Sequence, residues 1–269
     1  YGLSMILVFG LMLKFGNLRG GLKDLVKVFL YSGFTAVLAG LVFGSVFGVS
    51  IGLYKPLLDP INDPMPMLII SIGIGIVHIL CALVMKLISS IRNNDILGGL
   101  NDAVSWILIL VGISIVAVSL AMPLPSILSI LALVFIGVGA LIIMFLNGRD
   151  KPGIGGKIVS AFTGLYNSTS YLSDILSYSR ILALALSSGV IAMTFNLLGQ
   201  MVWGIPYVGF IFGILIYVVG HVFNFVMGLL SAYVHAGRLQ YLEFYGKFFE
   251  GGGYLYEPLQ PKLKYVYQI

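Results

Sequence analysis

Charged side chains are scarce in this chain: they make up 9% of its 269 residues, whereas 59% are hydrophobic and the mean hydropathy is +1.06. Because a soluble globular protein carries about 25% charged residues, this composition excludes an ordinary soluble domain and indicates a chain solvated by lipid. The single cysteine, Cys81, excludes an internal disulfide and argues against a cysteine-based metal site. The apolar runs are continuous and do not alternate with polar residues, which argues against a closed barrel.

Seven apolar segments are candidate membrane spans, judged against the roughly 20 residues that a helix needs to cross a bilayer. They run over residues 1–15, 24–45, 67–91, 103–122, 126–147, 158–203 and 207–249. At about 1.5 Å per residue, helices as long as the last two approach twice the hydrocarbon thickness, so they must tilt, bend or begin in the interface. We therefore predict an all-α polytopic membrane protein, a helical bundle with two long tilted C-terminal helices.

The links between these segments carry charge unevenly. Alternate links and the tail are basic, with Lys14, Arg19, Lys23, Lys27, Lys86, Arg92, Arg149, Lys151, Lys157, Lys247, Lys262 and Lys264. The other links hold only Lys55 against Asp59 and Asp63, and then no charge at 122–125 or 204–206. The positive-inside rule therefore predicts seven crossings with a cytoplasmic C-terminus. Since the sequence opens directly in an apolar segment without Met, we expect it to come from a longer protein with at least one earlier span.

Glycines recur every four residues around the end of the second segment, at Gly40, Gly44, Gly48 and Gly52. On a helix this spacing makes a smooth stripe on which another helix packs closely. We predict that the stripe serves helix packing within the bundle.

Arg180 lies near the middle of segment 158–203. A guanidinium cannot be deprotonated in a protein, so at bilayer depth it carries a cost of about 2.5 kcal/mol or more. Asp174 is six residues away and is not a favourable helical partner, and Glu243 lies close to the charged tail. We therefore expect the counter-charge of Arg180 to belong to another subunit.

Polar residues follow one face of each long segment. In the last segment they are His221, Asn224, Gly228, Ser231, His235 and Arg238, and in the preceding one Asn167, Ser170, Asp174 and Ser177, with Arg180 one turn further. Lipid exposure of such a row is costly, so we expect the stripe of the last segment to face its neighbour, a partner or water. For the isolated His78 we expect only a hydrogen bond to a neighbouring helix.

At these two stripes the sequence resembles the a subunit, also called subunit I, of prokaryotic V/A-type rotary ATPases. Residues 164–180, GLYNSTSYLSDILSYSR, are similar to that family's penultimate membrane helix, and residues 231–244, SAYVHAGRLQYLEF, to its last helix. Residues 248–254, FFEGGGY, are similar to its tail, and residues 43–48, FGSVFG, match its glycine-rich segment more loosely. One departure is Gly228, where some members carry glutamate.

The resemblance implies the stator half of an ion turbine, in which the two long helices face a rotating ring of c subunits. Each ring subunit carries one carboxylate, which an ion reaches through two offset half-channels. Arg180 matches the arginine that makes this carboxylate release its ion, and Arg238 matches the second arginine of the last helix. Our candidates for lining the half-channels are Asp174, Ser177, Tyr178, His221, Asn224, Ser231, His235, Gln240 and Glu243.

The same resemblance divides the chain into three parts. Residues 1–157 are expected to be supporting transmembrane helices, the first one truncated; residues 158–249 to be the two long helices of the ion-path face; and residues 250–269 to be a cytoplasmic tail. It also implies a non-catalytic subunit that binds no cofactor or metal and translocates H⁺ or Na⁺, with ATP hydrolysis in other subunits.

The partners implied by the resemblance are the c-subunit ring, the lipid bilayer, and the peripheral stalk and soluble ATPase sector, reached through an N-terminal arm outside this sequence. No nucleic acid is implied. The expected location is the cell membrane of a prokaryote.

The main alternative is a self-contained secondary transporter or channel with Arg180 in its substrate site. A transporter of this kind would need an internal repeat of the two long segments. The first five segments carry neither polar stripes nor buried arginines, so they do not repeat them. A purely structural scaffold does not explain two intramembrane arginines, and a seven-helix receptor does not fit the short links. Residues 151–158 do not form a phosphate loop, because Lys151 stands where the first glycine should be and Ile158 where Ser or Thr should follow.

Overall fold

The computed structural model describes residues 1–16, 19–50, 57–121, 125–147, 159–160, 162–164, 166, 168–249, 251–252 and 256. Apart from one short hairpin, the elements of these residues are helical. In chain order they are α1 (Gly2–Phe15), α2 (Gly21–Phe43), β1 (Ser45–Val46), β2 (Val49–Ser50), α3 (Pro64–Arg92), α4 (Ile96–Gly99), the π-helix η1 (Leu100–Val104), α5 (Ser105–Ala121), α6 (Ser126–Leu146), α8 (Ser168–Ser177), α9 (Ser179–Trp203), α10 (Gly209–Arg238), the π-helix η2 (Leu239–Phe244) and the 3₁₀-helix η3 (Tyr245–Lys247).

Six of the described helices are long and apolar enough to cross a membrane. They cover Gly21–Phe43, Pro64–Arg92, Ile96–Ser119, Ser126–Leu146, Phe162–Trp203 and Gly209–Lys247, and Gly2–Phe15 is a shorter apolar helix. The predicted all-α polytopic membrane protein is therefore confirmed. The last two spans are the longest, at 42 and 39 residues, as the segment lengths predicted. Their tilt relative to a bilayer stays a prediction.

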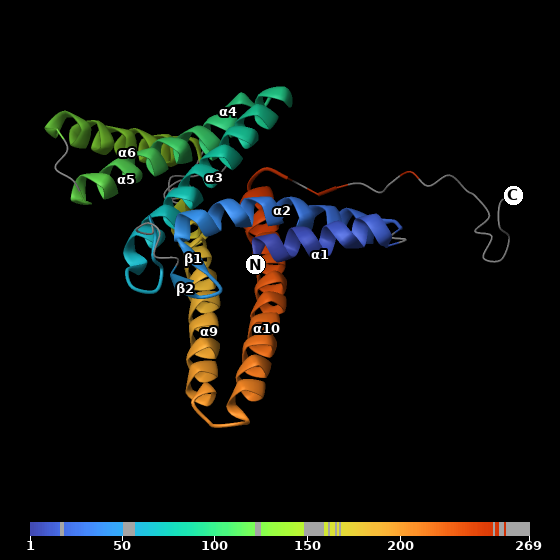
Figure 1. Cartoon of the computed structure of the whole chain (residues 1–269). Coiled ribbons are helices and arrows are strands. Elements are labelled where there is room, and N and C mark those ends of the chain that lie inside the picture. The colour runs from blue at the N-terminus through green and yellow to red at the C-terminus, as the bar shows by residue number, and fades with distance from the viewer. Residues whose placement is uncertain are drawn as a thin grey trace, which may run out of the picture.

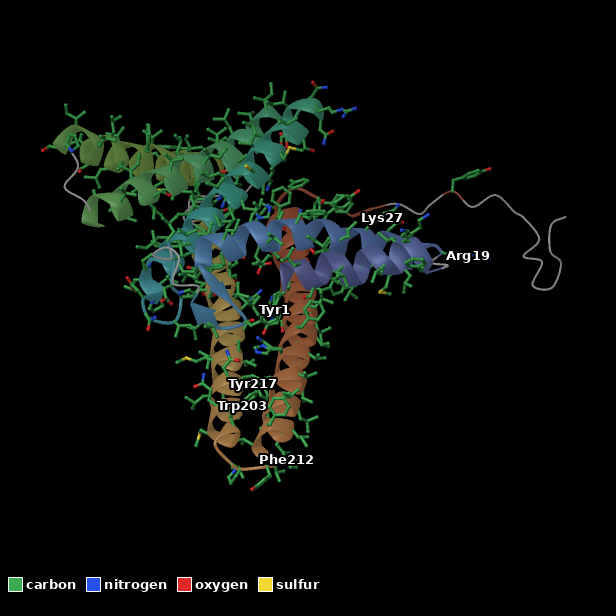
Figure 2. The ribbon with its side chains drawn as sticks, viewed as in Figure 1. Tyr1, Arg19, Lys27, Trp203, Phe212 and Tyr217 are labelled. Carbon is green, nitrogen blue, oxygen red and sulfur yellow. The ribbon has the colours of Figure 1, made fainter. Side chains whose placement is uncertain are left out.

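The long helices of the described residues are arranged mostly in pairs, with α3 between them (Figure 1). α1 packs on α2, α5 on α6, and α9 on α10, while α3 contacts α5, α8, α9 and η2. α9 and α10 form a long hairpin that runs across the direction of the α1–α2 pair. Figure 2 places Arg19 at the far end of the α1–α2 pair and Trp203 and Tyr217 near the tip of the α9–α10 hairpin, where their rings lie 6.2 Å apart.

The start of α3 shows how the sequence sets a helix boundary. The side chain of Asp63 accepts a hydrogen bond from the backbone N–H of Met65 at 3.4 Å, and Pro64 occupies the first turn. A carboxylate cap satisfies an otherwise unpaired N–H, and proline is tolerated there because its missing N–H has no partner to lose. Asp95 caps α4 in the same way, accepting from the N–H of Gly98 at 3.0 Å. The membrane span Ile96–Ser119 therefore begins earlier than the predicted segment 103–122.

The predicted glycine stripe is wrong. Gly44 ends α2 in the left-handed conformation, with φ 61° and ψ 20°, and Gly48, with φ 76°, lies in the turn between β1 and β2. Glycine adopts positive φ at little cost, so here it ends a helix and forms a turn. A side chain at Gly48 would also lie 2.8 Å from Cβ of Ala192, so this turn approaches α9 closely. Gly52 lies outside the described residues.

The main core lies where α3, α5, α6 and α8 meet. Its buried members are Ile79, Leu83, Trp106, Ile109, Leu110, Ile143, Tyr171, Ile175 and Tyr178, with Ile181 and Leu239 packed against it. Large apolar side chains elsewhere are widely exposed, as expected for helices that face lipid or partners. The core therefore positions α8 and the beginning of α9, the segment that carries Arg180.

Candidate functional site

Arg180 is the second residue of α9 and follows a one-residue break in the helix at Tyr178. Its side chain is half-buried, and Nη1 is buried without a hydrogen-bond partner among the described residues. The ion pairs found in that part of the chain are Lys27–Asp24, Lys86–Asp102 and Lys247–Asp174, none of which includes Arg180. A buried guanidinium hydrogen without an acceptor is costly, and within the described residues Arg180 has no counter-charge to offset that cost.

Asp174 is paired with Lys247, which belongs to η3. The two side chains are 21% and 14% exposed, and the Lys247 ammonium also lies 4.2 Å from the ring centroid of Tyr171. The Tyr171 ring packs in turn on Trp106, at 4.5 Å between centroids. Sequence reasoning counted Lys247 only as a charge of the tail, so this ion pair, which joins the start of one long helix to the end of the other, was missed.

We predict that the Asp174–Lys247 ion pair stabilises the end of the long hairpin that lies opposite the turn between α9 and α10. Lys247→Ala should lower the thermal unfolding midpoint of the assembled complex, because it leaves a half-buried carboxylate unpaired. The cost should fall between the ~0–1 kcal/mol of an exposed pair and the ~3–5 kcal/mol of a fully buried one. Exchanging both residues, Asp174→Lys with Lys247→Asp, should recover the larger part of the loss.

The matched control for this pair is Lys27→Ala, which breaks the exposed pair with Asp24, whose side chains are 46% and 76% exposed. This variant should change the midpoint little. A charge exchange that is as unstable as the single variant would contradict the pairing.

Tyr178 is 2% exposed and packs against α3. Its hydroxyl and Nδ1 of His78 are joined by a hydrogen bond of 2.5 Å. The expectation that His78 bonds a neighbouring helix is confirmed. The structure thus places Tyr178 in the protein interior, away from the exposed side of α9.

The polar stripe of α10 faces inward over part of its length. Nδ1 of His221 lies 2.8 Å from the Tyr1 hydroxyl and its Nε2 lies 3.0 Å from Oδ1 of Asn196. Asn224, 2% exposed, donates from Nδ2 to the carbonyl of Ser188 at 3.0 Å and to the Tyr1 hydroxyl at 2.9 Å. Two stripe residues are therefore held between α9, α10 and the beginning of α1.

The remaining stripe residues lie closer to the end of α10. Ser231 and His235 are half-buried, and Nδ1 of His235 is buried without a partner among the described residues, whereas Arg238 is exposed in the isolated chain. The expected orientation away from open surface is confirmed for His221 and Asn224 within the chain itself. For Ser231 and Arg238 it stays a prediction.

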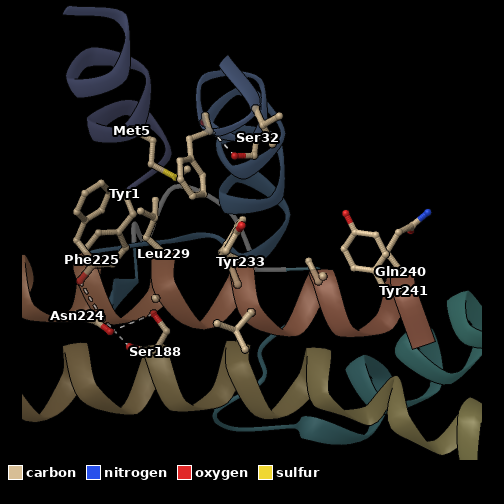
Figure 3. A pocket seen from close by; sticks show the side chains of 17 residues that line it. Tyr1, Met5, Ser32, Ser188, Asn224, Phe225, Leu229, Tyr233, Gln240 and Tyr241 are labelled. Atoms are coloured by element: carbon tan, nitrogen blue, oxygen red, sulfur yellow. Dashed lines mark hydrogen bonds between the residues drawn. The ribbon is translucent and has the colours of Figure 1, made fainter. Parts of the chain in front are cut away.

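A cavity of about 770 Å³ lies between α10 and the α1–α2 pair. Figure 3 shows the side chains that line it, with Asn224 and Ser188 at one end and Gln240 and Tyr241 at the other. From residue 224 to residue 240 the helix rises about 24 Å, so the cavity follows α10 over much of a bilayer's hydrocarbon thickness. Most of its lining is apolar, and polar groups of Ser32, Asn224, Tyr233 and Gln240 are available along it.

Glu243 of η2 is 3% exposed, and its Oε2 has no hydrogen-bond partner among the described residues. Because α9 and α10 are antiparallel neighbours, the start of α9 and the end of α10 lie at the same end of the hairpin. Unpartnered buried atoms of Arg180, His235 and Glu243 therefore belong to one end of the helix pair. The Ser177 hydroxyl, by contrast, donates to the carbonyl of Ser173 at 3.0 Å within its own helix.

No cluster of three or more His, Cys, Asp or Glu side chains that could hold a metal ion is found in the described part of the chain. The residues described above place the fixed positive charge of Arg180 at the same end of the helix pair as the titratable groups of His235 and Glu243. Such an arrangement can hold an anionic group and discriminate between its charged and neutral forms.

Comparisons of the sequence with known proteins give it relatives of one kind. Residues 169–261 match the V-type ATPase 116kDa subunit family. Over 271 aligned positions, covering 97% of the chain, the sequence is 32% identical to A-type ATP synthase subunit I of Pyrococcus horikoshii, of which 40% is covered. It is 30% identical over 214 residues, 76% of the chain, to A-type ATP synthase subunit I of Methanocaldococcus jannaschii, of which 29% is covered.

A bacterial relative, V-type ATP synthase subunit I of Chlamydia pneumoniae, is 30% identical over 133 residues, which cover 49% of the chain and 18% of that protein. The chain thus spans less than half the length of these relatives. The family match begins in α8 and includes most of the two long helices, and the subunit I of Pyrococcus horikoshii, 32% identical, aligns with 97% of the chain. This multi-pass membrane chain therefore belongs to the subunit I family of V/A-type ATPases.

Proposed function

We propose that this chain is the ion-translocating stator part of a V/A-type rotary ATPase, and that Arg180 faces the ion-binding carboxylate of a c-subunit ring. The observation that carries the proposal is the guanidinium of Arg180, half-buried at the start of α9 with Nη1 unpartnered in the described part of the chain. A permanent charge in an apolar bundle that forms no ion pair with any described residue needs a partner. A carboxylate from another subunit satisfies this need.

The proposed mechanism is charge exclusion. A ring carboxylate without its ion is stabilised beside Arg180 but costs several kcal/mol when it faces lipid. The ring can therefore turn a site towards lipid only after that site has bound an ion. The same positive charge repels a cation that would pass directly from one half-channel to the other.

The proposed ion paths use the polar groups on either side of Arg180. The cavity along α10, with Asn224 and Gln240 in its lining and His221 next to Asn224, is a candidate for one path. Ser231, His235, Arg238 and Glu243, near the end of α10 and in η2, are candidates for the other. Asp174, Ser177 and Tyr178 remain candidates as neighbours of these paths, and each, like His221 and Asn224, has a partner within the chain.

The proposal places this chain in an assembly. Its partners would be the c-ring and, through an N-terminal arm of the longer protein, the peripheral stalk and the soluble ATPase sector. The chain itself would hydrolyse no ATP and bind no cofactor; H⁺ or Na⁺ would be its transported ion. We place it in a prokaryotic cell membrane with its C-terminus in the cytoplasm, on the charge alternation of the links.

ATP-driven ion uptake into sealed vesicles tests the proposal. We expect the assembled ATPase with this subunit to accumulate ions when ATP is added, while the isolated subunit accumulates none. Uptake that an uncoupler abolishes without sodium indicates H⁺, and uptake that requires sodium and survives the uncoupler indicates Na⁺. ATP hydrolysis without accumulation of either ion in tight vesicles would contradict the proposal.

A further inference from the structure

An aromatic contact at a partly buried place joins α3 to both long helices. Its members are Gly75 and His78 of α3, Tyr178 at the break between α8 and α9, and Phe244 of η2. The Tyr178 hydroxyl is hydrogen-bonded to Nδ1 of His78 at 2.5 Å, and the His78 ring stacks on Phe244 with 4.3 Å between centroids and 14° between planes. We call these four residues the α3 bracket.

Gly75 allows the Tyr178 side chain to pack closely against α3. A Cβ atom at this position would lie 2.8 Å from Cγ and Cδ2 of Tyr178 and 3.0 Å from its Cβ. Because these atoms are close to the Tyr178 backbone, rotating the ring alone cannot relieve such a contact. The backbone of the helix break is thus pressed against α3 at a place where only a glycine leaves room.

The bracket holds the chain next to Arg180. Tyr178 is the residue between α8 and α9, its N–H donates to the carbonyl of Ile175 at 3.1 Å, and its carbonyl accepts from the N–H of Ile181 at 3.0 Å. These bonds span three residues and tighten the helix locally. The direction in which α9 leaves the break, and with it the position of Arg180 two residues later, depends on where Tyr178 is held.

The other side of the bracket contacts the segment that follows the second arginine. Phe244 ends η2, the π-helix that directly follows Arg238. The His78 ring contacts both Tyr178 and Phe244. The start of α9 and the segment after α10 therefore pack against the same residue of α3. Packing alone would need no polar atom here, because phenylalanine would fill the space of Tyr178. The hydrogen bond adds a directional contact.

We infer that His78 and Tyr178 are positioning residues, which hold the break between α8 and α9 against α3 and so set the place of Arg180. In this role neither residue contacts the transported ion. The inference rests on the proposed function of Arg180, but its geometric part does not depend on transport and can be measured separately.

The test measures the position of α9 relative to α3 in the assembled complex. Cys81→Ala removes the native cysteine, and Met85→Cys on α3 with Met193→Cys on α9, both at exposed positions, supply sites for spin labels. We expect Tyr178→Phe, which keeps the ring and loses the hydroxyl, and Gly75→Ala to shift or broaden the distance between the labels. Gly73→Ala is the matched control: a side chain there meets nothing within 4 Å, so the distance should not change.

A second measurement separates positioning from simple stability. We expect Tyr178→Phe and His78→Ala complexes to assemble and hydrolyse ATP but to pump several-fold fewer ions per ATP. His78→Gln should restore both the label distance and the pumping, because a glutamine amide can donate or accept the hydrogen bond. An unchanged label distance in both Tyr178→Phe and Gly75→Ala would overturn the inference, and so would a failure of His78→Gln to improve on His78→Ala.

The two proposals fail in different ways. If Arg180 variants pump normally, the proposed function is wrong while the label distances still report on the bracket. If Arg180 variants lose pumping but bracket variants keep both the distance and the coupling, only the positioning role is wrong.

Discussion

Arg180→Lys is expected to abolish ATP-driven ion uptake, although the net charge of the subunit does not change. Lysine places a compact charge on a different stem, lacks the planar fork of donors, and can lose its proton when desolvated. It would therefore neither hold a carboxylate in the same geometry nor keep the two half-channels separate. Arg180→Ala should fail as well while leaving the complex assembled, because the half-buried side chain acts by its charge. Uptake into sealed vesicles, normalised to the amount of assembled complex, measures both variants.

The matched control for this prediction is Arg92→Lys, at the exposed end of α3, which should pump normally. Substitutions of Arg238 should have intermediate effects, since its side chain is exposed in the chain and water can replace part of its field. Full ion pumping by the Arg180→Lys complex would refute the charge-exclusion mechanism.

Gly220→Ala is expected to disrupt the packing of the two long helices. A Cβ atom at this position would lie 2.2 Å from Cγ and 2.7 Å from Cβ of Phe195 on α9, so the two helices must separate or the phenylalanine must move. Overpacking of this kind typically costs about 1–3 kcal/mol. We expect a lower thermal unfolding midpoint and reduced coupling, because the spacing of α9 and α10 determines where both arginines lie.

Phe195→Ala combined with Gly220→Ala provides the internal check, because it removes the ring that the new methyl group meets. The double variant should be more stable than the sum of the two single losses predicts, which is the sign of a direct contact. Gly40→Ala on α2, where a Cβ atom meets nothing within 4 Å, is the control and should be close to wild type. Additive losses from Phe195→Ala and Gly220→Ala would show that the two residues do not meet.

Hydropathy was sufficient to predict the membrane spans because each span is decided by its own residues. The predicted segments 24–45 and 67–91 agree with α2 and α3 to within a few residues. The predicted start at residue 103 was late, since polar residues of η1 continue the helix: Asp102 pairs with Lys86 of α3 at 3.2 Å. Because Asp102 is paired with Lys86 on α3, the helix continues through this charged residue, where hydropathy alone predicted its start.

The candidate site was predicted only in part. The helical period correctly brought His221 and Asn224 to one face, where both are hydrogen-bonded within the bundle. The period could not show that Asp174 pairs with Lys247, or that Tyr178 turns towards α3. The predicted stripe of Asp174, Ser177 and Arg180 assumed that 158–203 is one uninterrupted helix, and the break at Tyr178 ends that regularity.

The sequence by itself determined the class of the protein, the number and length of its apolar helices, and the presence of an arginine without a nearby acid on its own helix. These properties follow from local composition and from the 3.6-residue period, which act within a single segment. The tertiary structure alone decided the glycine turn at Gly48, the Asp174–Lys247 ion pair at the open end of the hairpin and the α3 bracket beside Arg180. Each depends on the crossing of segments far apart in the chain, which neither hydropathy nor periodicity contains.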